Sequence, residues 1–338
     1  MKYAMLLWPH ANARYQAESV HLAQGELCML LHKVCPGASL CNTVRSEMNM
    51  LEFETPAPVS DEALRAIRSH SLMYMLFEVH GDMMRPMAGR AETYLEGDLP
   101  GILKYKGKTN ENFTSMLINA ALYSSAFWND ADARLKFMDP MCSRGTSLFL
   151  AVNRGWDADG SDISAADLRE LNLFFKRYMK YHRIKHSMVR KSQTIKNSKP
   201  APVVEFGFAA DNSAYRAGDI HMLRSAECDC GLINRVFGKN RYHILACDLP
   251  YGVQHSAGSE RFDQLLSRVL PVWRDVLMPG GAIALSYNTN TLKTETLRRL
   301  MAESGFEVMT GGIYDGFSHW VEQAVTRDIA VGVRPPKK

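Results

Sequence analysis

Three aspartates between residues 139 and 248 of this chain end short predicted strands and could act together in one site. Asp139 ends the run FMD, Asp162 follows a second short run, and Asp248 ends the run RYHILACD. Parallel strands present their carboxyl ends at one edge of a sheet, and ligands of α/β proteins bind there. The pattern therefore predicts that the three carboxylates share one edge, where they can accept hydrogen bonds from a ligand.

The stretch from residue 137 to residue 162 predicts a βαβ unit that binds a nucleoside. A turn of small residues follows Asp139, an apolar helix follows the turn, and a second strand ends at Asp162. An acidic residue about 20 positions after such a turn usually holds a ribose diol. The turn has a single glycine, Gly145, so it does not meet the G-x-G-x-x-G pattern of dinucleotide folds. An ordinary βα turn without a ligand is the alternative.

The turn resembles the DP-x-C-G-x-GT signature of S-adenosylmethionine (SAM) enzymes that methylate exocyclic amines of bases in RNA. Ser143 stands where these enzymes usually have glycine, and a serine in a left-handed backbone conformation is strained. The resemblance implies that SAM is the cofactor. The cofactor contacts that it implies here are Asp139, Met141, Cys142, Ser143, Gly145, Thr146, Asp162 and Ile163.

The segment that starts at Asp248 has residue types suited to methyl transfer onto an aromatic amine. The lone pair of such an amine is delocalised into the ring, so the nitrogen attacks a sulfonium poorly. Acceptors for its N–H hydrogens, here the Asp248 carboxylate and the Leu249 carbonyl, can aim the lone pair at the methyl carbon. Pro250 fixes the turn, and Tyr251 offers a face for a base turned out of its stack.

This segment, Asp248-Leu249-Pro250-Tyr251, resembles the D/N-P-P-Y/F motif of amino-group methyltransferases. Leucine in the second position also occurs in some RNA guanine-N2 relatives. The resemblance implies that these four residues catalyse a direct in-line displacement, helped mainly by positioning.

Two more segments resemble parts of the same family. GKTNENFT resembles the K-T-N-x-x-F-T segment of tRNA guanine-N2 methyltransferases, although the residues alone predict only a capped helix. The implied cofactor contacts are Thr109, Asn110, Phe113 and Thr114. Asp219 and Ile220 follow a glycine where SAM enzymes contact the adenine from the end of a third strand.

Basic residues gather between residues 176 and 199, where no acidic residue occurs. Such a run attracts a phosphate backbone through counterion release, and the interleaved Tyr178 and Tyr181 can stack on unpaired bases. A solvated helix end followed by a loose loop is the alternative. Beside a base-methylating motif, the run favours nucleic acid. The predicted contacts are Lys176, Lys180, Arg183, Lys185, Arg190 and Lys191.

The composition bounds the class of protein. The chain has 46% hydrophobic and 22% charged residues, which is ordinary for a globular protein, and a net charge of +4. No apolar run approaches the roughly 20 residues of a membrane span, and the N-terminal apolar run is too short for a secretion signal, so we expect a cytoplasmic protein. Seven scattered cysteines fit reduced thiols, and Cys228 and Cys230 lack a second pair at metal-ligand spacing, so no metal is expected.

The order of elements predicts two domains. Residues 1–80 have the pattern β-α-β-β-α-β of a small ferredoxin-like α+β domain, and they resemble the domain found in front of THUMP domains in tRNA-modifying enzymes. Residues 81–106 predict a linker that is rich in glycine and proline. Residues 107–338 predict an α/β fold with a seven-stranded, mostly parallel Rossmann-like methyltransferase sheet. Within it, Val203–Ala209 predicts a strand that can pair with residues 187–195.

Together these features predict a SAM-dependent N-methyltransferase acting on an exocyclic amine of a nucleic-acid base, with guanine N2 in tRNA or another RNA as the favoured target. N6-methylation of adenine in DNA or RNA is the closest alternative, because the same motif serves both reactions. A nucleic-acid-binding protein that has lost catalysis, or an amine methyltransferase for a small molecule or a protein, are further alternatives.

Overall fold

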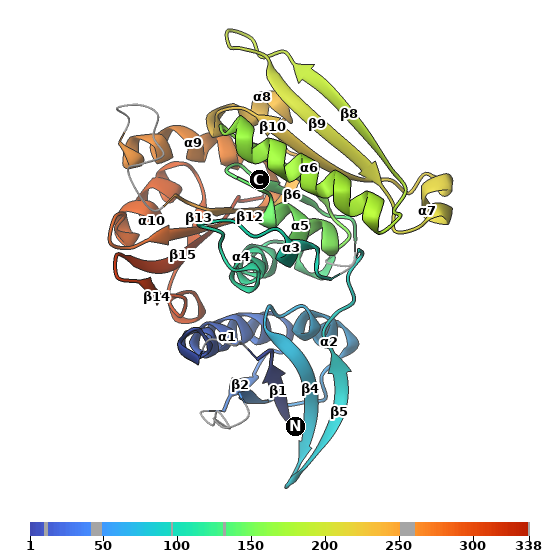
Figure 1. Cartoon of the computed structure of the whole chain (residues 1–338). Coiled ribbons are helices and arrows are strands. Elements are labelled where there is room, and N and C mark those ends of the chain that lie inside the picture. Colours follow the sequence, from blue (N-terminus) through green and yellow to red (C-terminus); the bar gives the residue numbers. More distant parts are fainter. Residues whose placement is uncertain (10–12, 42–48, 96, 131–132, 251–260, 337–338) are drawn as a thin grey trace. The chain divides into compact units, whose positions relative to one another are not determined.

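The computed structural model describes the 338 residues with the exception of 10–12, 42–48, 96, 131–132, 251–260 and 337–338 (Figure 1). The chain divides into two compact units. One comprises Met1–Glu92 and Met309–Ile329, and the other comprises Thr93–Val308 and Ala330–Lys338. Among the helices in the described part of the chain, none is long and apolar enough to span a bilayer.

The first unit contains an antiparallel sheet with the strand order β2-β3-β1-β4-β5. Its elements are β1 (Lys2–Leu7), α1 (Ala13–Val34), β2 (Ser39–Leu40), β3 (Met50–Glu54), α2 (Asp61–Arg68), β4 (Met73–His80) and β5 (Met83–Gly89). Tyr3, Met5 and Leu7 alternate along β1, so they share a face of the sheet. On that face they form a buried core with Leu27 of α1 and Ile67 of α2.

The segment predicted as a linker, residues 81–106, contains strand β5 of the first unit and helix α3 (Leu99–Ile102) of the second. Pro86 is compatible with a strand here because β5 lies at the edge of the sheet, where proline is tolerated. This fifth strand lies outside the predicted ferredoxin-like order, and that assignment remains a prediction.

The larger sheet has the strand order β13-β15-β12-β11-β6-β7-β10-β9-β8, and β14 pairs with β15. Its strands are β6 (Lys136–Asp139), β7 (Asp157–Asp162), β8 (His186–Gln193), β9 (Ala201–Phe208), β10 (His221–Glu227), β11 (Tyr242–Asp248), β12 (Leu277–Asn288), β13 (Glu307–Met309), β14 (His319–Glu322) and β15 (Val325–Val333). The neighbours β12, β11, β6, β7 and β10 are parallel, which confirms the α/β prediction.

The strand order reverses between β6 and β11: the chain proceeds from β6 to β7 and β10 on one side, and from β11 to β12 on the other. Such a switch point is where open α/β sheets bind ligands. The helices that connect the strands include α4 (Glu111–Ser124), α5 (Thr146–Asn153), α6 (Ala165–Tyr181), α7 (Asn212–Ala217), α8 (Ile233–Val236), α9 (Phe262–Val276) and α10 (Thr294–Glu303).

The predicted count of seven strands is too low for the sheet that the structure describes, which has ten. The difference comes partly from β8 and β9, which form the predicted hairpin. β9 pairs antiparallel with β10, and β8 pairs antiparallel with β9. Hydrophobic alternation predicts that a strand exists, but it does not predict which strand becomes its neighbour.

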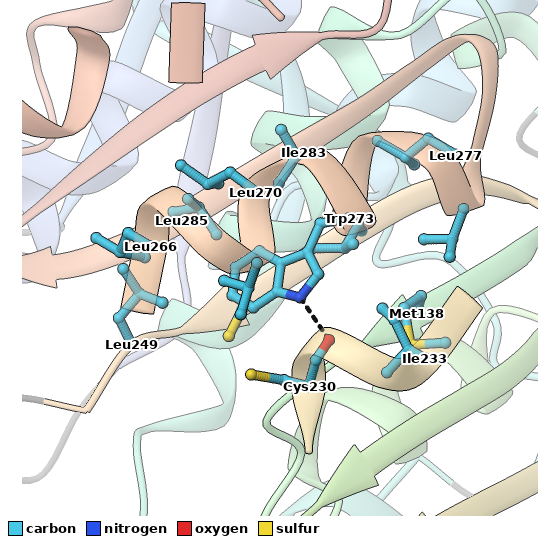
Figure 2. Close-up of a cluster of buried hydrophobic side chains, with 14 of the residues drawn as sticks. Met138, Cys230, Ile233, Leu249, Leu266, Leu270, Trp273, Leu277, Ile283 and Leu285 are labelled. Atoms are coloured by element: carbon cyan, nitrogen blue, oxygen red, sulfur yellow. Dashed lines mark hydrogen bonds between the residues drawn. The ribbon is translucent and has the colours of Figure 1, made fainter. Parts of the chain in front are cut away.

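A buried cluster around Trp273 of α9 supports the end of β11 (Figure 2). The indole N–H of Trp273 donates a 3.1 Å hydrogen bond to the carbonyl of Cys230. Leu249, Leu266 and Leu285 belong to the same cluster. The residue that follows Asp248 is thus anchored in the core, which fixes the position of the aspartate.

We expect Trp273→Ala to lower the free energy of unfolding by about 3–5 kcal/mol, because it leaves a cavity and an unpaired buried carbonyl. Urea denaturation followed by circular dichroism measures this. Leu173→Ala on α6 is the control, because Leu173 is 43% exposed and its loss should cost under about 0.5 kcal/mol. Equal effects of the two substitutions would contradict the packing described here.

Candidate active site

Asp139, Asp162 and Asp248 lie at the ends of three parallel strands, β6, β7 and β11. We call this side of the sheet the carboxyl edge and the opposite side the amino edge. Asp139 is level with Gly160 of β7, and the charges of Asp162 and Asp248 are both close enough to raise the pKa of Asp139. The structure therefore brings the three carboxylates to one side of the sheet, at the switch point between β6 and β11.

Asp139 is buried and fully engaged by its neighbours. One carboxylate oxygen accepts the N–H of Met141 at 3.0 Å, and the other accepts the hydroxyl of Ser147. Burial raises the pKa of Asp139 to about 7, and the hydrogen bonds oppose this effect. Its charge near neutral pH therefore depends on what else occupies the site.

The Asp162 carboxylate connects the turn to the start of α6. Its Oδ2 accepts the backbone N–H of Ser143 at 2.8 Å, and its Oδ1 accepts the N–H of Ser164 at 2.8 Å. Ser143 adopts the left-handed conformation, with φ of 45°, which is the strain expected of a serine at this position. The charged hydrogen bond to Asp162 offsets that strain. Burial raises the pKa of Asp162.

The turn packs too tightly for a larger residue at Gly145. This residue has φ of 84°, and a Cβ atom there would lie 2.6 Å from Cδ1 of Leu171. Cys142 is also buried, and burial raises the pKa of its thiol well above the ordinary range, so it is unsuited to act as a nucleophile.

Tyr105 also contacts this turn, although no motif in the sequence predicts the contact. The guanidinium of Arg144 lies 4.7 Å from the centre of the Tyr105 ring, and the Tyr105 hydroxyl lies 3.4 Å from Oγ1 of Thr146. Tyr105 lies within the segment predicted as a linker, where an isolated aromatic residue has no recognisable spacing to the turn.

Thr109 contacts Asp248 directly. Its hydroxyl donates a hydrogen bond to Oδ2 of Asp248, across 139 positions of the chain. Thr109 precedes Asn110, whose side chain caps α4 by accepting the N–H of Asn112 at 2.8 Å. Phe113 and Thr114 follow as buried residues of α4. A firmly capped helix start therefore positions the Thr109 hydroxyl beside the aspartate.

Only part of the predicted Asp248-Leu249-Pro250-Tyr251 segment lies within the described residues. Leu249 is buried, and its N–H donates to the carbonyl of Ser286 at 2.9 Å. This bond joins the end of β11 to β12. Tyr251 lies outside the described residues.

The prediction for Asp219 and Ile220 is wrong. Both residues precede β10, so they lie at the amino edge, away from the three carboxylates. Gly218 is in the left-handed conformation because it ends helix α7 rather than a strand. Asp219 forms an ion pair with Arg134 there, at 3.4 Å.

The residues at the carboxyl end of β10 are Cys228 and Asp229. The N–H of Cys228 donates to the backbone carbonyl of Asp162 at 3.1 Å, so this segment lies beside the site. Asp229 accepts the N–H of Gly231 at 2.6 Å and forms an ion pair with Arg268. The two acidic residues around this strand end, Glu227 and Asp229, are the sequence signal that could have identified it. Among the residues that the structure describes, no group of histidine, cysteine and acidic side chains is suited to hold a metal ion.

The predicted nucleic-acid contacts are spread over a helix, the segment after it and a strand. Lys176 and Lys180 lie on α6, Arg183 and Lys185 lie between α6 and β8, and Arg190 and Lys191 lie on β8. Because β8 begins level with the start of β10, the residues just before it lie near the amino edge.

Comparison with solved structures finds low sequence identity throughout. TrmN from Thermus thermophilus is 14% identical, with 99% of this chain and 100% of that chain covered and a TM-score of 0.46. A TehB-like SAM-dependent methyltransferase from Corynebacterium glutamicum is 13% identical, covering 62% and 84% of the two chains, with a TM-score of 0.36. A ribosomal protein L11 methylase from Lactobacillus delbrueckii is also 13% identical, covering 68% and 81%, with a TM-score of 0.36.

No protein-family model matches this sequence, and no curated protein matches it. The three structures named above have TM-scores below 0.5, so we infer the function from the residues and geometry of the site itself.

The raised pKa of Asp139 predicts a pH dependence of stability. Folding favours the protonated carboxyl, so this contribution to stability is present near pH 4 and is lost as the pH rises toward 7. Asp139→Asn has no such proton to lose. We measure the free energy of unfolding of both proteins by urea denaturation from pH 5 to 8. Over this range, the difference between the variant and the unsubstituted protein should shift by at least about 1 kcal/mol in favour of the variant. A constant difference across this range would contradict the assignment.

Proposed function

We propose that this chain is a SAM-dependent methyltransferase that methylates an exocyclic amine of a base in RNA, with guanine N2 as the target. The observation that carries the proposal is the convergence of Asp162, the turn before α5 and Asp248 at the switch point of one sheet. A site for a nucleoside and an acceptor for an amine therefore lie next to each other.

The residues around Asp162 fit the nucleoside part of SAM. The Asp162 carboxylate accepts the backbone N–H groups of Ser143 and Ser164, and that of Ile163 also contributes. A carboxylate offers about four lone-pair sites, so acceptor capacity remains for a ribose hydroxyl. Ile163 is 60% exposed and offers an apolar surface for the adenine ring next to Cys228. When bound, SAM would supply an activated methyl group on a sulfonium.

Asp248 and its neighbours would prepare the amine. The Asp248 carboxylate accepts an N–H hydrogen of the amine and stabilises the positive charge that develops on nitrogen. Thr109 holds one oxygen of this carboxylate, so the orientation of the group is set before the substrate arrives. Leu249, anchored by Ser286, presents its backbone carbonyl as a second acceptor. These groups position the reactants, and a general base with a tuned pKa is not required.

RNA is favoured as the substrate by the exposed basic residues near the site and by the resemblance of the Asp248 segment to guanine-N2 enzymes. We also propose the ferredoxin-like assignment for the first unit. N6-methylation of adenine uses the same acceptors and is distinguished by the product.

The direct test is incubation of the protein with methyl-labelled SAM and either total RNA or DNA, followed by nucleoside analysis. We expect label in N2-methylguanosine from RNA. Label in N6-methyladenosine would support the alternative target. Label only on a ring carbon or a ribose oxygen, or no transfer at all, would contradict the proposal.

Asp248→Ala should lower the rate of methyl transfer by about 10²–10³-fold, because it removes the acceptor that acts on the amine. The dissociation constant of SAM, measured by calorimetry, should stay within about threefold. If the affinity for SAM fell by as large a factor as the rate of methyl transfer, Asp248 would instead belong to the cofactor site.

Asp162→Ala should weaken SAM binding by about 10–100-fold, because it removes a charged acceptor for the ribose. Asp219→Ala is the matched control, since Asp219 is the same residue type at the amino edge. Calorimetric titration of both variants compares them. Equal affinities for SAM would overturn the ribose assignment.

A further inference from the structure

The register of the β8–β9 hairpin determines which of its ends lies near the candidate active site. His186 at the start of β8 pairs with Phe208, and Phe208 pairs with His221 at the start of β10. Because β10 is parallel to β7, this end of the hairpin lies at the amino edge. The far end of β8 and the turn at residues 194–200 therefore lie on the same side of the sheet as Asp162 (Figure 1).

The same register divides the basic run into two groups at opposite edges. The helix-end group lies near the amino edge, where α6 finishes and β8 begins. It consists of Lys180, Arg183 and Lys185. The hairpin group lies toward the carboxyl edge, at the end of β8, in the hairpin turn and on α8. It consists of Arg190, Lys191, Lys196, Lys199 and Arg235.

The turn of the hairpin is anchored and does not form a loose loop. Ile195 is buried, with 3% of its surface exposed, and the N–H of Ser198 donates to its carbonyl at 3.1 Å. Arg235 of α8 donates to the carbonyl of Lys196 at 3.3 Å. Since α8 follows the carboxyl end of β10, this contact joins the hairpin turn to the edge that carries the site.

Most charges of the hairpin group are available to a ligand. Arg190, Lys196, Lys199 and Arg235 are exposed, and none has an ion pair with an acidic side chain in the part of the chain that the structure describes. Lys191 differs, because it forms a 2.6 Å ion pair with Glu205. The group thus presents positive charge, and phosphate oxygens are the ligands that complement it.

The distance from this group to the site suits a polymer. Strands in a sheet are about 4.8 Å apart, so β8 lies about 14 Å from β7 and about 24 Å from β11 along the sheet. A base held at Asp248 can thus belong to a chain whose flanking phosphates extend along the carboxyl edge to the hairpin.

We propose that the hairpin group binds the phosphate backbone of the RNA whose base reaches Asp248, and that the helix-end group does not contribute. This inference rests on the proposed function, because it assigns the binding surface for the same substrate. It refines the contacts that the sequence predicted, since it retains Arg190 and Lys191, adds Lys196, Lys199 and Arg235, and leaves out Lys176 of α6 and the helix-end group.

The test compares two triple variants that remove the same net charge. The first is Arg190→Gln with Lys196→Gln and Lys199→Gln, and the second is Lys180→Gln with Arg183→Gln and Lys185→Gln.

Binding of bulk tRNA is measured by fluorescence anisotropy over a range of salt concentrations, and SAM binding by calorimetry. We expect the first variant to bind RNA at least about tenfold more weakly and with a smaller salt slope, with SAM affinity unchanged. The second should stay within about twofold of the unsubstituted protein.

Equal weakening in both variants, or greater weakening in the second, would overturn the proposal, as would unchanged binding in the first. Absence of RNA binding by the unsubstituted protein, or tighter binding of DNA of matched length through the same residues, would also overturn it. If a triple variant does not fold, Lys199→Gln and Lys185→Gln replace the two sets, because both residues lie outside the strands.

Methyl transfer is measured separately on the same proteins. RNA binding through the hairpin without any transfer would contradict the proposed function but support the binding surface. Transfer that is unaffected in the first variant, together with unchanged binding, would support the function but overturn the binding surface.

Discussion

The Asp162 carboxylate is the interaction on which the candidate site depends. It accepts one backbone N–H from the turn before α5 and another from the start of α6, so it joins two loops at the end of β7. Ser143 is strained, and this bond is what holds it in its left-handed conformation. In the proposed function the same carboxylate also accepts from the ribose of SAM. One group would then link two loops and contact the cofactor.

The second half of the site is positioned by buried packing. Leu249 is part of the core around Trp273 (Figure 2), and its N–H donates a hydrogen bond to Ser286 of β12. These contacts hold the backbone next to Asp248 in place. Thr109 then sets the orientation of the Asp248 carboxylate from the capped start of α4. The switch point of the sheet brings the two halves of the site together.

The sequence predicted the features that local patterns encode. Asp139, Asp162 and Asp248 end strands that the sequence predicts, and all three lie at the predicted edge. The contact between Thr109 and Asp248 could not be predicted as such, because it joins residues from distant parts of the chain. The prediction that Asp219 ends a third strand is wrong, because the residues before it form a helix. The spacing of Asp211 and Gly218 is instead that of a capped short helix.

The basic run shows a different limit of sequence reasoning. Residues 176–199 form one continuous basic stretch in the sequence, but the reversal between α6 and β8 separates its charges onto opposite edges of the sheet. Only the strand register determines which charges face the site. The charge alone therefore predicts the kind of partner but not the surface that binds it.

The most direct measurement is a crystal structure of the complex with S-adenosylhomocysteine. We predict that the ribose hydroxyls lie within hydrogen-bond distance of the Asp162 carboxylate, with the open side of the sulfur facing Asp248. A nucleoside bound elsewhere on the chain, or a sulfur facing away from Asp248, would contradict this prediction.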